Sequence, residues 1–348
     1  MITTLIEYFL LIILFLLFFL IVLIIYLSLK RRQEVVHSRK QNEFISNSKD
    51  DWYRFLIEGF EVKPSMIPEK TVDYVAAEQV LLTYKQNVYS RFTEENIRTY
   101  AETYLQSIYR KQLLSKNWSK RINALYRVLD FQMVCLKEEL FRILNSDTLT
   151  KEEYIQICKI LSKFQDPELI KQLNRPIFIL GEYEYRKLVH ELEEKQMDLL
   201  IEEFDQLTNN LQYAIIDWIE QHYAIHRYRL LEKLVVDERE EIRLRALKAM
   251  KEIGYVPNVN LIKQLVESEV WEERLMAAKL LMIVEKDVAT PLLTILIEDP
   301  VWWVRNEAAG SIIKSQNGPN TLRFIIGKSS DPFAIDIATE VLQRSSAL

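Results

Sequence analysis

The sequence predicts an all-α protein in which a single transmembrane helix precedes an α-solenoid of helical hairpins. Three observations lead to this prediction. Residues 8–29 form an uncharged apolar stretch, a set of side chains recurs every 31 residues near the C-terminus, and only 6 Gly and 9 Pro occur in 348 residues that are 49% hydrophobic. An apolar chain with so few turn-forming residues favours long helices over tight β-turns.

The apolar stretch is long enough to cross a membrane. Residues 8–29 are mostly Leu, Ile, Phe and Val and contain no charge. A helix of this length covers about 33 Å, and the hydrocarbon core of a bilayer is about 30 Å thick. A cleaved signal peptide would begin with basic residues, whereas here Glu7 precedes the stretch and Lys30 follows it. We therefore expect an uncleaved transmembrane helix.

The charges beside this helix predict its orientation. Lys30, Arg31 and Arg32 follow it directly, and residues 1–7 contain no basic side chain. The positive-inside rule then predicts a single-pass protein of the cell membrane, with residues 1–7 as a short extracytoplasmic tail and the C-terminal domain in the cytoplasm. The basic cluster is also placed to contact anionic lipid headgroups, although its role as a topology signal explains it without them.

Residues 30–67 are expected to form a juxtamembrane linker. They are polar as far as residue 50, and Pro64 and Pro68 break any helix that begins at Asp51. Residues 68–116 follow as a helical N-terminal cap region of two helices, for one of which Thr93 is the expected N-cap.

Aromatic residues are dense in this part of the chain, and most are expected in the core. Three of them lie close to the bilayer in sequence, so one hypothesis places them on the membrane surface or on a membrane partner. Together with the basic cluster they make up the predicted membrane-proximal residues. These are Lys30, Arg31, Arg32, Trp52, Tyr53 and Phe55.

A 31-residue repeat organises residues 237–348. Four kinds of side chain recur in the same frame: an arginine, an alanine, a large apolar residue, and an aspartate or serine. The columns are Arg243, Arg274 and Arg305; Ala246, Ala277 and Ala308; Met250, Leu281 and Ile312; and Asp237, Ser268, Asp299 and Ser330. Asp and Ser are preferred helix N-caps, and small and large apolar residues let two helices pack closely. Each unit is therefore predicted to be a helical hairpin whose first helix begins at the Asp or Ser.

The segment Asp-Pro-Val-Trp-Trp-Val-Arg-Asn-Glu-Ala-Ala at residues 299–309 resembles the HEAT repeat, in the short bacterial form also found in phycobilin lyase-like proteins. The resemblance is clear over residues 237–348, which end in a C-terminal cap where Asp336 and Thr339 replace the expected Arg and Ala. Residues 117–236 are assigned to degenerate HEAT-like repeats, with the stretch 175–204 outside the period.

Candidate partner-binding residues lie in two columns of the repeat. An aromatic column contains Trp271, Trp302 and Phe333, and Trp303 stands beside it. These rings either contact a partner, since Trp is frequent in binding hot spots, or pack on the neighbouring repeat. For the arginines, the HEAT resemblance implies bonds to turn carbonyls and acidic caps, and the alternative is contact with a partner. The candidates are Trp302, Trp303, Trp271, Arg274 and Arg305.

Several other functions are not expected. A net charge of −5 disfavours nucleic-acid binding. The sequence contains no Gly-rich phosphate loop and no nucleophile elbow, so no catalytic residue, cofactor or small-molecule substrate is predicted. No metal is expected either, because His222 and His226 lack a third ligand. Cys135 and Cys158 are predicted to be buried free thiols.

A solenoid offers an extended surface, and the resemblance implies that this surface binds protein. The sequence therefore predicts a membrane-anchored cytoplasmic scaffold or accessory subunit, not an enzyme. Its partner is expected to be a membrane-bound protein at the inner face, such as an enzyme of cell-envelope synthesis in a bacterium. A membrane-linked regulatory sensor and a HEAT-like lyase-type enzyme are the alternatives.

Overall fold

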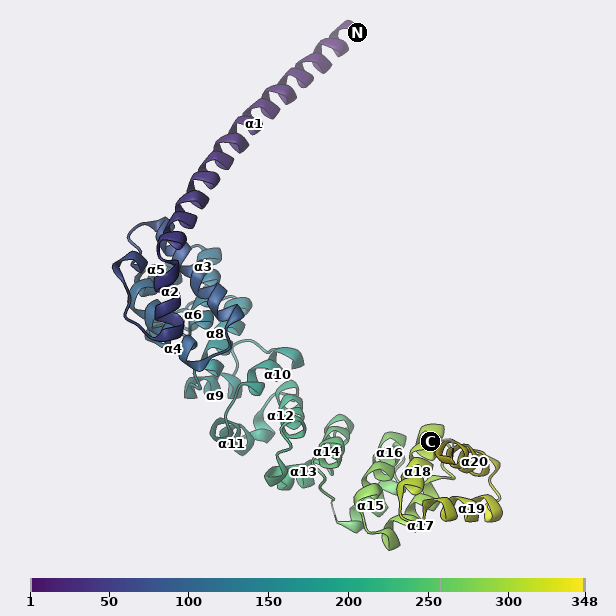
Figure 1. Cartoon of the computed structure of the whole chain (residues 1–348). Coiled ribbons are helices and arrows are strands. Elements are labelled where there is room, and N and C mark those ends of the chain that lie inside the picture. Colours follow the sequence, from purple (N-terminus) through teal and green to yellow (C-terminus); the bar gives the residue numbers. More distant parts are fainter. Residues whose placement is uncertain (1, 257, 347–348) are drawn as a thin grey trace. The chain divides into compact units, whose positions relative to one another are not determined.

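The computed structural model describes residues 2–256 and 258–346, with side chains from Leu14 onward. Within these residues every regular element is a helix. The chain divides into two compact units, unit 1 (Met1–Phe164) and unit 2 (Gln165–Leu348). Successive helices in each unit form antiparallel pairs that stack on one another (Figure 1). The predicted all-α solenoid is confirmed.

Helix α1 (Ile2–Asn47) is one continuous helix that projects from unit 1 (Figure 1). From Leu14 onward its apolar part is exposed, and it is long and apolar enough to cross a membrane. The side chains of residues 8–13 and of the predicted tail 1–7 lie outside the described part of the chain. The expected linker at residues 30–67 needs correction, since residues 30–47 continue the helix. They contain no Gly or Pro that would end it.

The rest of unit 1 packs around the C-terminal end of α1. Its core is rich in aromatic rings, with Trp52 and Tyr104 each 4.8 Å from the ring of Tyr100. The Tyr100 hydroxyl donates to the carbonyl of Met66 at 2.5 Å. The elements are α2 (Lys49–Tyr53), η1 (Arg54–Glu58), η2 (Pro64–Met66), α3 (Thr71–Asn87), α4 (Arg91–Tyr100), η3 (Ala101–Leu105), α5 (Gln106–Leu113), α6 (Trp118–Phe131), η4 (Val134–Leu136), α7 (Lys137–Leu144) and α8 (Lys151–Lys163). Helix α4 begins after Ser90, so the predicted cap Thr93 lies inside the helix and is buried.

Unit 2 has two layers of helices. The even-numbered helices α10 to α20 pack on one another in order, and the odd-numbered helices α9 to α19 flank them. The elements are α9 (Pro167–Asn174), α10 (Glu182–His190), α11 (Glu194–Glu202), η5 (Phe204–Gln206), α12 (Asn209–Gln221), η6 (Ile225–Arg227), α13 (Tyr228–Leu234), α14 (Glu240–Glu252), α15 (Val259–Val266), α16 (Trp271–Leu280), η7 (Leu281–Ile283), α17 (Lys286–Leu296), α18 (Trp302–Lys314), α19 (Gly318–Lys328) and α20 (Pro332–Ser346). The boundary between the predicted regions 117–236 and 237–348 lies within these layers, so the degenerate repeats after residue 164 pack like the clear repeats.

The predicted helix starts in unit 2 need correction. Helices α14, α16 and α18 begin three residues after the Asp or Ser that the sequence suggested as the N-cap. Asp299, for example, accepts from the amide of Val301 at 2.8 Å and so stabilises the turn before α18. Arg305 holds the same turn, because its Nη1 donates to the carbonyls of Asp299 and Pro300. These bonds satisfy the carbonyls outside the helix and delay its start.

A left-handed residue ends the first helix of several hairpins. Gln132, Gln165, Tyr223 and Gly254 have φ values of 50°, 52°, 50° and 71° and follow α6, α8, α12 and α14. After Gly254 the amide of Tyr255 donates to the carbonyl of Met250 at 2.9 Å, which closes a Schellman-type turn. The same turn thus recurs in both units, although only Gly254 marks it in the sequence.

Candidate partner-binding surface

Two of the three repeat arginines of unit 2, Arg243 and Arg274, bridge consecutive hairpins. In the first of its two hairpins, Nη1 of Arg274 donates to the carbonyls of Ser268 and Glu269 at 2.7 and 3.2 Å. Its Nε and Nη2 donate to the two carboxylate oxygens of Asp299 in the next hairpin, at 2.5 and 3.1 Å. These hydrogen bonds raise the pKa of Arg274 above its ordinary value. All three nitrogens of the Arg274 guanidinium therefore donate hydrogen bonds within the chain, as the HEAT resemblance implied.

Arg243 uses the same arrangement. Its Nη1 donates to the carbonyls of Asp237 and Glu238 at 2.9 and 3.0 Å. Its Nε donates to Glu273 in the following hairpin at 2.6 Å. We call this series of guanidinium–carboxylate bridges the arginine ladder.

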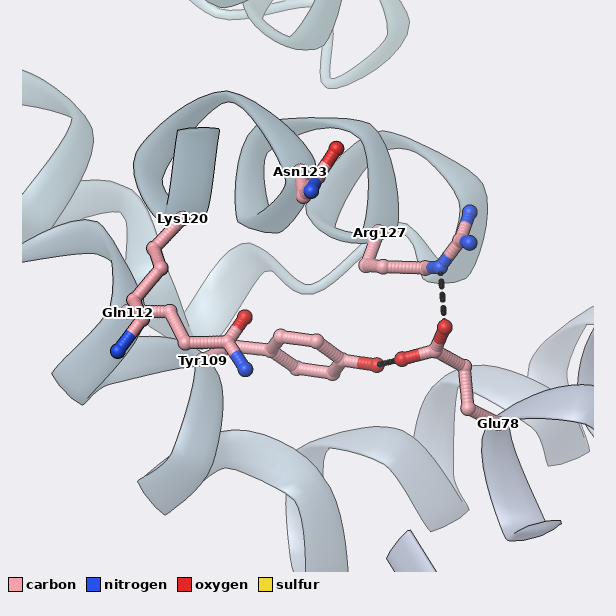
Figure 2. Close-up of a pocket in the computed structure, with 6 residues that line it drawn as sticks. All are labelled: Glu78, Tyr109, Gln112, Lys120, Asn123 and Arg127. Carbon is pink, nitrogen blue, oxygen red and sulfur yellow. Dashed lines mark hydrogen bonds and ion pairs between the residues drawn. The ribbon is translucent and has the colours of Figure 1, made fainter. Parts of the chain in front are cut away.

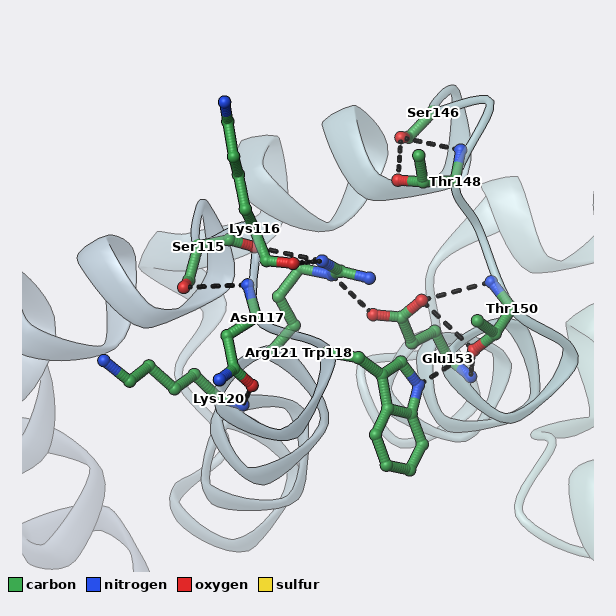
Figure 3. A network of polar contacts seen from close by, with 10 residues as sticks. All are labelled: Ser115, Lys116, Asn117, Trp118, Lys120, Arg121, Ser146, Thr148, Thr150 and Glu153. Carbon is green, nitrogen blue, oxygen red and sulfur yellow. Dashed lines mark hydrogen bonds and ion pairs between the residues drawn. The ribbon is translucent and has the colours of Figure 1, made fainter.

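The ladder also occurs in unit 1, where Figure 3 shows it around Arg121. Nη1 of Arg121 donates to the carbonyls of Ser115 and Lys116, and Nε donates to Glu153 at 2.7 Å (Figure 3). Glu153 is buried and completes a capping box with Thr150 at the start of α8. Arg121, which lies in the stretch assigned to degenerate repeats, thus makes the same contacts as Arg243 and Arg274 in the clear repeats.

Trp118 is a member of the aromatic column that the sequence analysis missed. It begins α6 three residues before Arg121, as Trp271 and Trp302 begin helices three residues before their own arginines. Its indole Nε1 donates to the hydroxyl of Thr150 in the next hairpin at 3.2 Å (Figure 3). The recurrent Trp-x-x-Arg pattern in the sequence could have identified Trp118 as a member of the column. For Trp118 the contact is with the neighbouring repeat, which favours the structural interpretation at this position.

Several exposed aromatic rings lie at the C-terminal end of unit 2. Trp302 and Trp303 are 44% and 60% exposed, and their rings meet edge to face with centroids 4.8 Å apart. Phe333 near the start of α20 is also exposed, and its ring lies 5.1 Å from the guanidinium of Arg305. Trp271 is half-buried. We call Trp302, Trp303 and Phe333 the aromatic rim.

Arg305 lies beneath this rim and differs from the other ladder arginines. It is 9% exposed, and Nη1 donates to two turn carbonyls at 2.7 and 3.0 Å. In the part of the chain that the structure describes, its buried Nε has no hydrogen-bond partner. The candidates from the sequence thus separate into the paired Arg274, the half-buried Trp271, and a group of exposed rings around a buried arginine.

Two of the predicted membrane-proximal aromatic residues are core residues instead. Trp52 is 1% exposed, and its Nε1 donates to the hydroxyl of Ser48 at 3.0 Å. Phe55 is likewise buried, near Tyr100. The expected surface position is wrong for both, because the aromatic cluster of unit 1 provides them with an apolar environment. Tyr53 is exposed.

The basic residues after the predicted span lie on the exposed helix α1. Lys30, Arg31 and Arg32 are all solvent-accessible. They are on the same continuous helix as the apolar stretch, directly at its C-terminal end. A helix of this kind would present them at the level of lipid headgroups if its apolar part spans a bilayer.

A polar pocket of about 380 Å³ lies between α3, α5 and α6. Glu78 accepts from the hydroxyl of Tyr109 at 2.5 Å and from Nε of Arg127 at 2.7 Å (Figure 2). Burial, together with the charge of Glu78, raises the pKa of Tyr109 above its ordinary value. Gln112, Lys120 and Asn123 complete the lining (Figure 2). Both carboxylate oxygens of Glu78 thus accept hydrogen bonds from neighbouring side chains, and the pocket can offer hydrogen bonds to a polar molecule.

The histidines and cysteines make ordinary structural contacts. His222 stacks on Trp218 with ring centroids 4.3 Å apart, and His226 lies 3.4 Å from Glu194. No group of three His, Cys, Asp or Glu among the described residues is placed to hold a metal ion. Cys135 and Cys158 are free thiols, as predicted, although Cys135 is only half-buried.

Comparison with known proteins agrees with the repeat. Residues 229–313 match the family model described as HEAT repeats. Similar solved structures include human deoxyhypusine hydroxylase in complex with glycerol, which is 12% identical, with 72% of this chain and 98% of that chain covered and a TM-score of 0.29. An engineered protein is 15% identical, with 78% and 96% covered and a TM-score of 0.24. No curated protein matches the sequence.

Proposed function

We propose that this chain, a solenoid with HEAT repeats, is a membrane-anchored scaffold or accessory subunit that holds a protein partner at the inner face of the membrane. The observation that carries the proposal is the continuity of α1. One helix contains an exposed stretch apolar enough to span a bilayer and packs at its C-terminal end against α3 of unit 1. A repeat domain is thereby joined to its anchor without a flexible break.

The length of α1 beyond its apolar stretch would set the distance of unit 1 from the membrane. Residues 30–47 extend α1 beyond the apolar stretch, and at 1.5 Å per residue they span about 27 Å. Unit 1 would then begin a few tens of ångströms from the hydrocarbon core. Confinement to this layer raises the effective concentration of the solenoid for membrane-bound proteins over soluble ones. A membrane-bound partner is therefore favoured.

The aromatic rim is the part of the described surface best suited to protein contact. Trp302 and Trp303 are exposed rings in edge-to-face contact at the start of α18, and Phe333 is an exposed ring at the start of α20. Tryptophan is enriched in interface hot spots because it buries a large apolar area at little cost in side-chain entropy. The rim is therefore the proposed contact surface. Trp271, being half-buried, extends it only at its edge.

The cytoplasmic side is proposed from the basic residues that follow the apolar stretch, Lys30, Arg31 and Arg32. On that side, an enzyme of cell-envelope synthesis is a partner that would share the membrane plane with α1. The sensor alternative uses the same anchor but assigns recognition to the span. The lyase-type alternative would need a reaction centre, and the polar pocket of unit 1 offers a carboxylate already held by Tyr109 and Arg127.

Site-specific photo-crosslinking in intact cells tests this proposal. A photoreactive amino acid would replace Trp303, and for comparison Tyr89 of unit 1, which is also highly exposed. Crosslinking of one membrane protein from position 303, but not from position 89, would support the scaffold. The same experiment with a form that begins at Lys30 should lose most of the product, because the anchor concentrates the chain at the membrane. If no protein is crosslinked from position 303, or if removal of the anchor changes nothing, the proposal is wrong.

A further inference from the structure

We infer that Arg305 and the aromatic rim form a receptor site for a carboxylate, supplied by an Asp or Glu side chain in an acidic segment of the partner. This inference rests on the proposed function, since it names the chemistry by which the scaffold recognises its partner. It begins from a difference between Arg305 and the other arginines of the ladder.

Every other ladder arginine has a carboxylate from the next hairpin at its Nε. The three distances from Nε to oxygen are 2.7 Å for Arg121 and Glu153, 2.6 Å for Arg243 and Glu273, and 2.5 Å for Arg274 and Asp299. Arg305 has the same two carbonyl contacts through Nη1 as its counterparts. Its Nε, however, is buried without a partner, and Nη2 makes no hydrogen bond within the described residues.

The missing carboxylate follows from the sequence of the last hairpin. Glu153 and Glu273 are the third residues of α8 and α16, and the third residue of α20 is Ala334. The turn before α18 contains Asp299, which pairs with Arg274. The turn before α20 contains Asp331, which accepts from the amide of Phe333 at 2.8 Å and makes no ion pair with Arg305 among the described residues. Ser329 is occupied in another way, because its hydroxyl donates to Glu298 at 2.6 Å. The last hairpin thus leaves the guanidinium edge open.

The mode of binding is shown by Arg274. The carboxylate of Asp299 accepts hydrogen bonds from both Nε and Nη2 of Arg274, which is the bidentate geometry of arginine–carboxylate pairs. A partner carboxylate would occupy the equivalent edge of Arg305. The ring of Phe333 lies 5.1 Å from this guanidinium and is mostly exposed, so we expect it to rotate aside when a carboxylate binds.

The surroundings favour a protein segment as the occupant. Trp302 and Trp303 precede Arg305 by three and two residues on α18 and present exposed aromatic surface, which suits an apolar side chain near the acidic one. A charged group that binds beneath rings is shielded from water, and its hydrogen bonds are correspondingly stronger. The site therefore combines a specific charge contact with an apolar contact, as protein interfaces commonly do.

Fluorescence anisotropy tests the site in the full chain in detergent micelles. The probe is a fluorescein-labelled peptide of two leucines followed by four glutamates, and the control peptide has lysines in place of the glutamates. We expect the acidic peptide to bind at low salt and more weakly at high salt, and the basic peptide not to bind. Arg305→Gln should weaken binding at least about tenfold, which corresponds to one lost charge-assisted contact of about 1.4 kcal/mol. The exposed Arg323 on α19 provides the matched control, and Arg323→Gln should leave the affinity unchanged.

A second pair of variants covers the case in which Arg305→Gln does not fold, as judged by circular dichroism. Ser330 and Ser345 are both exposed, and they lie before and near the end of α20. Ser330→Asp places a carboxylate near the open guanidinium edge and should weaken peptide binding severalfold, whereas Ser345→Asp should not.

Equal affinity in folded Arg305→Gln, or equal weakening by Arg323→Gln, would overturn the carboxylate site. A crosslinked partner whose capture at position 303 is insensitive to Arg305→Gln would also overturn it, while leaving the scaffold proposal in place. Peptide binding that depends on Arg305, together with the absence of any crosslinked membrane protein, would retain the site and reject the proposed function.

Discussion

Replacing Arg274 by methionine is expected to destabilise the C-terminal hairpins of unit 2 by about 3–5 kcal/mol. The substitution removes four hydrogen bonds, two of them to Asp299, whose side chain is only 4% exposed. The remaining bond to that carboxylate comes from the amide of Val301. The cost is large because a charge stays buried after its partner is lost. Screening by solvent does little to reduce it, since both side chains are mostly buried.

A double-mutant cycle separates the ion pair from the other contacts. Asp299→Asn leaves Arg274 its two carbonyl acceptors and should cost only about 1–2 kcal/mol. If the pair couples as its geometry indicates, the double variant should be more stable than the sum of the two changes by at least about 1 kcal/mol.

Hydrogen exchange measured by mass spectrometry is the appropriate assay, because two units need not unfold in one step. A loss of 3–5 kcal/mol corresponds to exchange roughly 100- to 5,000-fold faster in peptides that cover residues 268–299. Arg323→Met, at an exposed site, should change exchange less than about threefold. An acceleration below about fivefold for Arg274→Met, or strictly additive single effects, would refute the assignment of the ladder as a main source of stability.

Three further predictions concern other parts of the chain. Tyr223→Gly should stabilise unit 2 by about 0.5–1 kcal/mol in urea unfolding, because glycine adopts φ near 50° without strain; a loss of stability would show that the exposed ring contributes a contact. Burial raises the pKa of Cys135 to about 11 and that of Cys158 to about 12. Since the thiolate is the reactive form, labelling by a thiol reagent should be slow at pH 7 and should quicken about tenfold per pH unit for Cys135; rapid labelling at pH 7 would contradict this pKa. Trp52→Ala should cost about 3–5 kcal/mol and Tyr53→Ala less than about 1 kcal/mol, and equal effects in thermal unfolding would contradict the core position of Trp52.

The repeat could be predicted because its signal is local and recurs. An arginine every 31 residues, with alanine and a large apolar residue at fixed offsets, identifies the first helix of each hairpin from the sequence alone. The start of that helix could not be predicted in the same way. An aspartate such as Asp299 can cap a helix or the turn before it, and the choice depends on carbonyl bonds from Arg305, six residues further on.

The linker was mispredicted because a polar composition is typical of a solvent-exposed helix as well as of a loop. The absence of Gly and Pro from residues 30–47 was the better indication of α1. Trp52 could not be placed from its neighbours in sequence, since its burial depends on Tyr100, which a later helix brings into contact.

For the candidate surface, Trp302, Trp303 and Arg305 could be named from the sequence, but their exposure and hydrogen bonds could not be predicted. Their relation depends on the hairpin that follows. Ala334 leaves Nε of Arg305 without an acceptor, and Phe333 covers the guanidinium. Such a difference between equivalent positions is invisible to a periodic pattern, which treats every repeat alike. An alignment of each arginine with the acid of the next hairpin would have revealed it.

If α1 anchors the chain in a membrane as proposed, its continuity fixes the angle of unit 1 about the helix axis. An α-helix turns by about 100° and rises 1.5 Å for each residue, so a helix without a hinge transmits rotation about its own axis as well as height. Insertion of one alanine between the apolar stretch and Phe44 would turn unit 1 about the membrane normal by roughly a quarter of a revolution while moving it outward by little more than the length of a bond. If the chain is anchored as proposed, the direction in which unit 1 faces a neighbouring protein is therefore set by the number of residues in the helix.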